Sequence, residues 1–67
     1  MENSTKRKLP VPVIDSSAFI AKGAIVIGNV TLEADVSIWY NATVRSSDDP
    51  IRIGQGSNVQ DNAVFSH

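Results

Sequence analysis

The chain has 67 residues and no cysteine, and its six lysine or arginine residues nearly balance its seven aspartate or glutamate residues, for a formal net charge of −1. The near-neutral balance gives no indication of nucleic-acid binding, and the lack of cysteine excludes disulfides and thiolate metal sites. A chain of this length forms at most one small domain.

Residues 1–10 are polar and include the basic run Lys6, Arg7, Lys8, and we expect them to form a disordered tail. The tail lacks the apolar segment of a secretory signal, and no apolar stretch approaches membrane-spanning length. We therefore expect no membrane partner, and the cytoplasm as the default location.

From residue 14 onward, apolar residues recur every six positions. The series is Ile14, Ile20, Val26, Leu32, Ile38 and Val44, followed after one interruption by Ile53, Val59 and Phe65. An amphipathic helix needs apolar steps of three and four, so the period argues against helices. A β-sandwich would have turn signals every 8–12 residues and a less regular phase. The period is typical of a parallel β-helix built from hexapeptides over residues 11–67.

Three positions in each hexad have different roles. The six-step residue points into the core, because strand side chains alternate between faces. The residue three places later is a corner residue, mostly of a type that tolerates positive φ. The residue four places later is small or β-branched, which fits the crowded corner. The expected corner residues are Ser17, Gly23, Asn29, Asp35, Asn41, Gly56 and Asn62.

Three hexads make one coil, so the sequence predicts coils at residues 14–31, 32–52 and 53–67, of which the last is incomplete. The second coil is three residues too long, and the extra residues fall within 45–52 as a polar excursion. Inserted loops in solenoids often carry binding residues, although a plain solvated loop explains the same composition. We expect Val26, Val44 and Phe65 to stack in one column, with the ring of Phe65 pointing inward.

Three stretches of the sequence resemble a known family. They read Ser-Ile-Trp-Tyr-Asn-Ala-Thr-Val-Arg at 37–45, Ile-Arg-Ile-Gly at 51–54 and Ser-Asn-Val-Gln-Asp-Asn-Ala-Val-Phe at 57–65. Residues 11–67 resemble the N-terminal half of the γ-class carbonic anhydrases. The resemblance implies a left-handed parallel β-helix that forms a homotrimer, a zinc or iron ion held between subunits by three histidines, and reversible hydration of carbon dioxide to bicarbonate.

The resemblance also implies roles for three side chains. Gln60 matches the glutamine that orients the metal-bound oxygen, and Arg45 and Asp61 match charged residues that act across the subunit interface near the site. Each has an ordinary interpretation as well. Gln60 and Arg45 each follow a core residue and so face solvent, where a polar side chain needs no special role. Asp61 is of a residue type that often accepts hydrogen bonds from backbone amides at a corner.

The sequence departs from the family at the positions that carry the chemistry. Where the family usually reads Arg-Gly-Asp, this chain reads Arg45, Ser46, Ser47, with Asp48 one residue late. The slot of the first metal-binding histidine is occupied by Ser66. His67 is a candidate metal ligand only after a one-residue slip, which in a strand moves a side chain to the other face. No other histidine is present, so the chain lacks a complete metal site, and it binds either the zinc or iron that the resemblance implies or no metal.

Three functions remain open from the sequence. The leading hypothesis is carbon dioxide hydration by the complete protein. The second is a non-catalytic β-helix scaffold or assembly subunit that has lost its metal ligands. The third and least favoured is a hexapeptide acyltransferase, which would use a histidine as general base with a coenzyme A thioester; no acyl-carrier pocket is recognisable in the sequence.

Overall fold

The computed structural model describes residues 9–67, which form seven strands and no helix. The strands are β1 (Val13–Ile14), β2 (Phe19–Ile20), β3 (Ile25–Leu32), β4 (Ser37–Ile38), β5 (Thr43–Ile53), β6 (Asn58–Val59) and β7 (Val64–Ser66). Of the tail expected over residues 1–10, residues 1–8 lie outside the described part of the chain. The described residues accordingly contain no helix able to cross a membrane.

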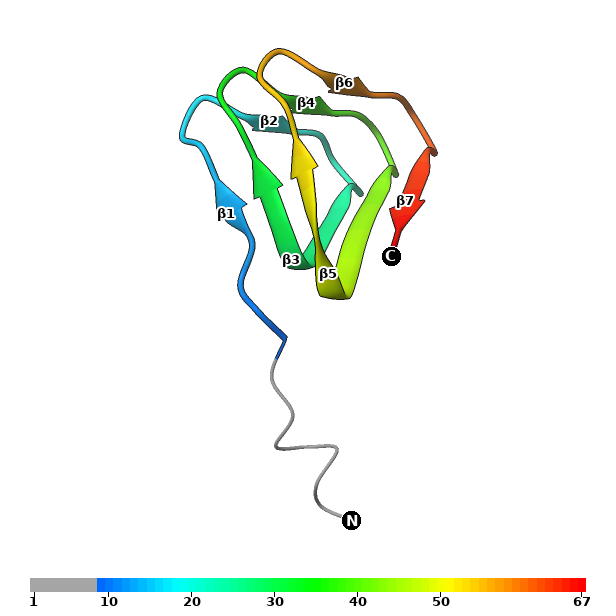
Figure 1. Ribbon diagram of the computed structural model, residues 1–67. Helices are drawn as coiled ribbons and strands as arrows, with labels where there is room; N and C mark the ends of the chain where they lie inside the picture. Colours follow the sequence, from blue (N-terminus) through cyan, green and yellow to red (C-terminus); the bar gives the residue numbers. More distant parts are fainter. Residues whose placement is uncertain (1–8) are drawn as a thin grey trace.

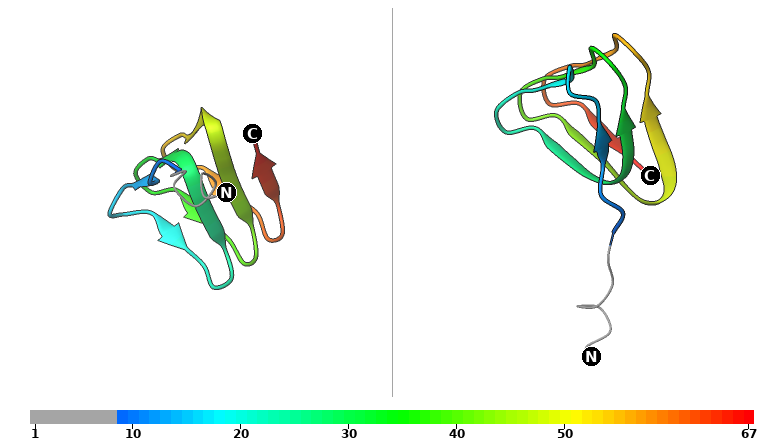
Figure 2. Two further views of the ribbon diagram at one scale, coloured as in Figure 1. Left: turned by 90° about the horizontal axis from the view of Figure 1, so that it is seen from below. Right: turned by 90° about the vertical axis from the view of Figure 1, so that its left-hand side faces the viewer.

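All strand pairings are parallel, and they form two sheets with the orders β1-β3-β5-β7 and β2-β4-β6 (Figure 1). β3 and β5 bend midway, so the first sheet covers two sides of each coil and the second sheet covers the third side. Figure 2 shows the successive coils stacked along one axis. The predicted fold class, an all-β left-handed parallel β-helix of hexapeptide repeats, is confirmed.

The pairing register reproduces the predicted coils. Ile14 pairs with Leu32, 18 residues further on, whereas Leu32 pairs with Ile53, 21 residues further on. The second coil is therefore three residues longer than the first. The register shift that accommodates these residues lies between Gly28 and Val30.

The hydrophobic core is concentrated in the middle coil. Leu32, Ile38 and Val44 are almost completely buried there, and Ile53 and Val59 of the third coil are also buried. The ends of the stack are more open, because a terminal rung has a neighbour on one side only. Phe65 stacks on Val44 as expected, but 46% of its surface is exposed, so the prediction of an inward ring is corrected to a half-covered one.

Positive φ angles occur at five of the seven expected corners, namely Gly23, Asp35, Asn41, Gly56 and Asn62. Ser17 and Asn29 are the exceptions. At the first, the Asp15 carboxylate accepts hydrogen bonds from the Ser17 amide (2.9 Å) and hydroxyl (2.6 Å). At the second, the positive φ belongs to the preceding residue, Gly28. Side-chain hydrogen bonding and a shifted glycine thus replace the expected geometry at these two corners.

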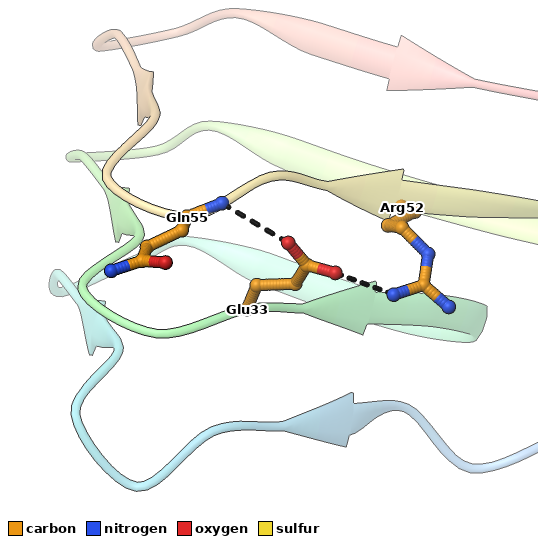
Figure 3. A network of polar contacts seen from close by, with 3 residues as sticks. All are labelled: Glu33, Arg52 and Gln55. Atoms are coloured by element: carbon orange, nitrogen blue, oxygen red, sulfur yellow. Dashed lines mark hydrogen bonds and ion pairs between the residues drawn. The ribbon is translucent and has the colours of Figure 1, made fainter.

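One corner also carries a polar network between coils (Figure 3). The Glu33 carboxylate accepts hydrogen bonds from Arg52 Nη1 at 2.5 Å and from the backbone N–H of Gln55 at 3.2 Å. Exposed ion pairs of this kind contribute about 0–1 kcal/mol. The coils are therefore held together mainly by core packing and by the backbone hydrogen bonds between parallel strands, and this network adds little.

Residues at equivalent positions in successive coils differ in burial, and this difference allows the core packing to be tested. Ile20 and Ile38 lie in one column, but Ile20 is 38% exposed and Ile38 is fully covered. We expect Ile38→Ala to reduce the free energy of unfolding by about 2–5 kcal/mol, and Ile20→Ala to reduce it clearly less. Denaturant unfolding followed by circular dichroism measures both; equal losses would contradict the packing described here.

The Asp15 corner predicts a pH dependence. The hydrogen bonds from the Ser17 hydroxyl and amide hold the pKa of the Asp15 carboxyl below its ordinary value. A carboxyl whose pKa is lower in the folded state stabilises the fold above the unfolded-state pKa, and this contribution disappears as the pH falls through the folded-state pKa. We expect Asp15→Asn to lessen the loss of stability between neutral and strongly acidic pH. Unchanged acid sensitivity in denaturation midpoints would refute this role.

Candidate functional site

A groove beside the bend of β5 brings together several of the sequence-predicted residues. It has a volume of about 350 Å³. Its lining residues are Leu9, Ile27, Arg45, Ser46, Ser47, Ser66 and His67. The groove therefore contains Arg45, the serine in the expected ligand slot, and the candidate metal ligand His67.

Arg45 and Ser66 face each other from adjacent coils. They are paired in the β5–β7 register, and Arg45 Nε donates a hydrogen bond of 3.3 Å to Ser66 Oγ. Among the described residues Arg52 forms an ion pair with Glu33, and the His67 imidazole lies beside the Asp49 carboxylate. The Arg45 guanidinium thus has no carboxylate partner within the described part of the chain.

The polar excursion is held against the coil over residues 46–50. Ser46 is buried, and its hydroxyl donates a hydrogen bond to the Asp49 carbonyl. Asn29 Nδ2 donates to the Asp48 carbonyl at 2.9 Å. The three extra residues lie within the bounds of β5. Residues 47–50 are exposed and have no partner in the β3–β5 register, so they form a polar bulge that these hydrogen bonds tie to its own coil and to the neighbouring one.

His67 continues the strand ladder and makes one polar side-chain contact. Its amide donates to the Arg45 carbonyl at 3.1 Å, and its Nδ1 lies 3.5 Å from the Asp49 carboxylate. Among residues 9–67 there is no group of three histidine, cysteine, aspartate or glutamate side chains that could hold a metal ion. The Ser66 hydroxyl already contacts Arg45. The described residues therefore do not by themselves fit a zinc or iron site.

Gln60 and Asp61 lie elsewhere on the same coil. Both are exposed at the corner between β6 and β7, where the Gln60 carbonyl accepts a hydrogen bond from the Ala63 amide at 3.1 Å. Neither residue lines the groove. Arg45 and Asp61 therefore do not come together within one chain.

Sequence reasoning missed the close packing of Gly28 against Ser46, one of the groove residues. A side chain at Gly28 would collide with the backbone carbonyl of Ser46, and Ser46 in turn fixes the turn that carries Asp49. The signal available in the sequence was the three-residue excess of the second coil. That excess locates the irregularity but does not show which side chain becomes buried there.

The strand arrangement defines a protein of the hexapeptide-repeat β-helix class, and the groove beside β5 is a polar site centred on Arg45. The chain is 48% identical over 55 residues to a carbonic anhydrase of Methanosarcina thermophila and 46% identical over 52 residues to a probable carbonic anhydrase of Methanocaldococcus jannaschii. It is 40% identical over 53 residues to the mitochondrial γ carbonic anhydrase 1 of Arabidopsis thaliana.

These matches cover 81%, 78% and 79% of this chain, respectively, but only 22%, 33% and 19% of the relatives. The chain is thus γ-carbonic-anhydrase-like over about four fifths of its length, and it spans a third or less of the length of these relatives. An uncharacterized transferase of Bacillus subtilis is also 40% identical, over 50 residues. No family model and no solved structure matches the chain.

The close approach at Gly28 predicts a position-specific effect of adding a methyl group. Gly28 and Gly56 both have positive φ, so alanine at either position costs about 1–2 kcal/mol in backbone conformation. Only at Gly28 does the added Cβ also meet backbone. We expect Gly28→Ala to destabilise the fold more than Gly56→Ala and to perturb Ser46 and Asp49 amide resonances in NMR spectra. Equal destabilisation by the two variants would contradict this contact.

Proposed function

We propose that this β-helix belongs to a carbonic anhydrase that interconverts carbon dioxide and bicarbonate. The observation that carries the proposal is the 46–48% identity to the proteins of Methanocaldococcus jannaschii and Methanosarcina thermophila, which are described as a probable carbonic anhydrase and a carbonic anhydrase, respectively. The occurrence of Arg45, Gln60 and Asp61 in stretches that resemble motifs of the γ-class carbonic anhydrases also supports it. In this proposal Gln60 orients the reacting oxygen, while Arg45 and Asp61 supply opposite charges beside it.

A homotrimer is part of this proposal, because one chain keeps the proposed residues apart. Arg45 lies at one end of the β5–β7 face, and Asp61 lies at the corner that leads into the other end. Association of chains would allow a carboxylate of one subunit to approach the arginine of another. The same face exposes Ile25, Ile27 and Val64, and exposed apolar surface of this kind favours association.

A zinc or iron cofactor is likewise proposed, but the described residues cannot supply all of its ligands. Neutral imidazole is the usual nitrogen ligand of zinc and iron, and the chain has a single histidine. That histidine contacts Asp49, and the expected ligand slot holds Ser66. The remaining ligands would have to come from residues other than those described, and we assign no step of the reaction to a metal held by this segment.

The second candidate is a non-catalytic scaffold of the same fold. Two observations favour it. The position expected to hold a histidine ligand is occupied by Ser66, whose hydroxyl accepts a hydrogen bond from Arg45. Ser47 occupies the position where the family's acidic residue is expected. A scaffold would keep the stacked core and the apolar flank while losing metal binding.

One experiment separates these functions. The complete protein, including the residues that would supply the remaining ligands, is purified anaerobically without chelators and analysed for zinc and iron, and carbon dioxide hydration is measured by stopped flow on the same sample. The enzyme predicts about one metal ion per subunit and hydration that stops after chelation. A metal content well below this ratio, together with no carbon dioxide hydration, would contradict the carbonic anhydrase function and favour the scaffold function.

Substitutions at the two adjacent positions test which of them is the ligand slot. Ser66→His should increase the bound metal if the other ligands are supplied, since the side chain at this position faces the groove beside Arg45. His67→Gln is the matched control and should leave the metal content unchanged. A loss of metal in the control, or no gain in Ser66→His, would contradict the assigned register.

A further inference from the structure

We propose that Ser47 is a phosphorylation site for an acid-directed serine kinase, and that its phosphate pairs with the Arg45 guanidinium. In this reaction the γ-phosphorus of ATP forms a bond to Ser47 Oγ and loses its bond to the β–γ bridging oxygen. ADP leaves, and the hydroxyl proton passes to the catalytic carboxylate of the kinase. Three features of β5 support this modification, and none of them depends on the proposed function.

The first feature is the accessibility of the Ser47 hydroxyl. Ser47 is exposed at the start of residues 47–50, which have no partner in the β3–β5 register. A modifying enzyme can bind such a segment, because its backbone groups are not taken up by a sheet. The adjacent Ser46 is only 2% exposed, and its hydroxyl donates to the Asp49 carbonyl. The structure therefore distinguishes two neighbouring serines that the sequence alone does not.

The second feature is the negative charge that follows Ser47. Asp48 and Asp49 come directly after it, and both are exposed. Kinases select substrates partly by charge pattern, so a kinase with a basic substrate groove favours carboxylates at these positions. Pro50 biases the preceding residue toward extended backbone, which is the form of a bound substrate segment. The acidic residues thus provide recognition, and the bulge provides access.

The third feature is an arginine on the same side of the strand. Along β5, Val44 and Ser46 are buried whereas Arg45 and Ser47 are exposed. Residues two apart in a strand project from the same side, with their Cα atoms about 6–7 Å apart, and both line the groove. Arg45 uses Nε for its bond to Ser66. Its terminal nitrogens can therefore bind two phosphate oxygens, which is the strong form of such a pair.

Phosphorylation would reverse the charge of the groove. A phosphoserine carries a charge of about −1.5 to −2 at neutral pH, which exceeds the single positive charge of Arg45. The Asp49 carboxylate lies close to the same groove, beside His67. The modified groove would therefore repel other anions, and the bulge would act as a charge switch on an unchanged solenoid.

Kinase treatment of the folded chain tests the site. The full chain is incubated with magnesium ATP and an acid-directed serine kinase of the casein kinase type, and the phosphate is located by fragmentation mass spectrometry. We expect one phosphate, at Ser47, and none after Ser47→Ala. Asp48→Asn should slow incorporation by about 10-fold, as for one lost charge-assisted contact. Asp35→Asn, at a corner of the same coil, should not. Absence of incorporation, or incorporation at Ser46, would overturn the proposal.

A second measurement tests the contact with Arg45 without a kinase. The chain is synthesised with phosphoserine at position 47, and its phosphorus NMR signal is followed between about pH 4 and pH 8. A neighbouring guanidinium favours the dianion, so it lowers the second pKa of the phosphate. We therefore expect this pKa to be higher in Arg45→Gln by about 0.5 unit or more. The other charged groups near the phosphate, Asp48, Asp49 and His67, are the same in both chains.

The matched control removes a different arginine of the same strand. Arg52 is exposed and paired with Glu33, so Arg52→Gln should leave the phosphate pKa unchanged. Retained dispersion of the amide signals shows that each variant is folded. Equal phosphate pKa values with and without Arg45, or equal effects of the two substitutions, would overturn the pairing. Neither measurement uses carbon dioxide hydration, so failure of the proposed function would leave both results unaffected.

Discussion

The structure depends on the in-register stacking of inward apolar side chains from one coil to the next. Parallel pairing places each residue over its counterpart, so that Ile20, Ile38 and Val59 form one column and Val26, Val44 and Phe65 another. The core lies in the middle of these columns, and their end residues Ile20 and Phe65 remain partly exposed. The same register fixes the outward side chains. Arg45 lies beside Ser66 because Val44 stacks on Phe65, so the pairing of these two groove residues follows from core packing.

The lattice could be predicted from the sequence because it is repeated. An apolar residue every six positions determines which side chains point inward, and a turn former three places later determines most corners. What repetition could not determine is how far each rung is covered, since burial depends on the rungs on both sides. This is why Phe65 occupies the expected column and is still half exposed.

The site was less predictable because it lies where the repeat is broken. The length of the second coil located the irregularity, and the register placed Arg45 beside Ser66. The buried hydroxyl of Ser46, the collision that excludes a side chain at Gly28, and the contact of Asp49 with His67 arise from a non-repeated three-dimensional fit. For Asp61 the motif could be recognised in the sequence, but the structure shows no contact between Asp61 and Arg45 within one chain.

The position of the insertion has a consequence for how such proteins diversify. The three additional residues enter at a corner, and the strand pairs on both sides keep the same phase relative to the neighbouring coil. Changes in length at this corner therefore leave the register of the core columns intact, although the buried Ser46 and its close contact with Gly28 restrict which residues the start of the segment can carry. Related solenoids can thus acquire different ligand chemistry at one vertex while the rest of the coil remains under the same packing constraints.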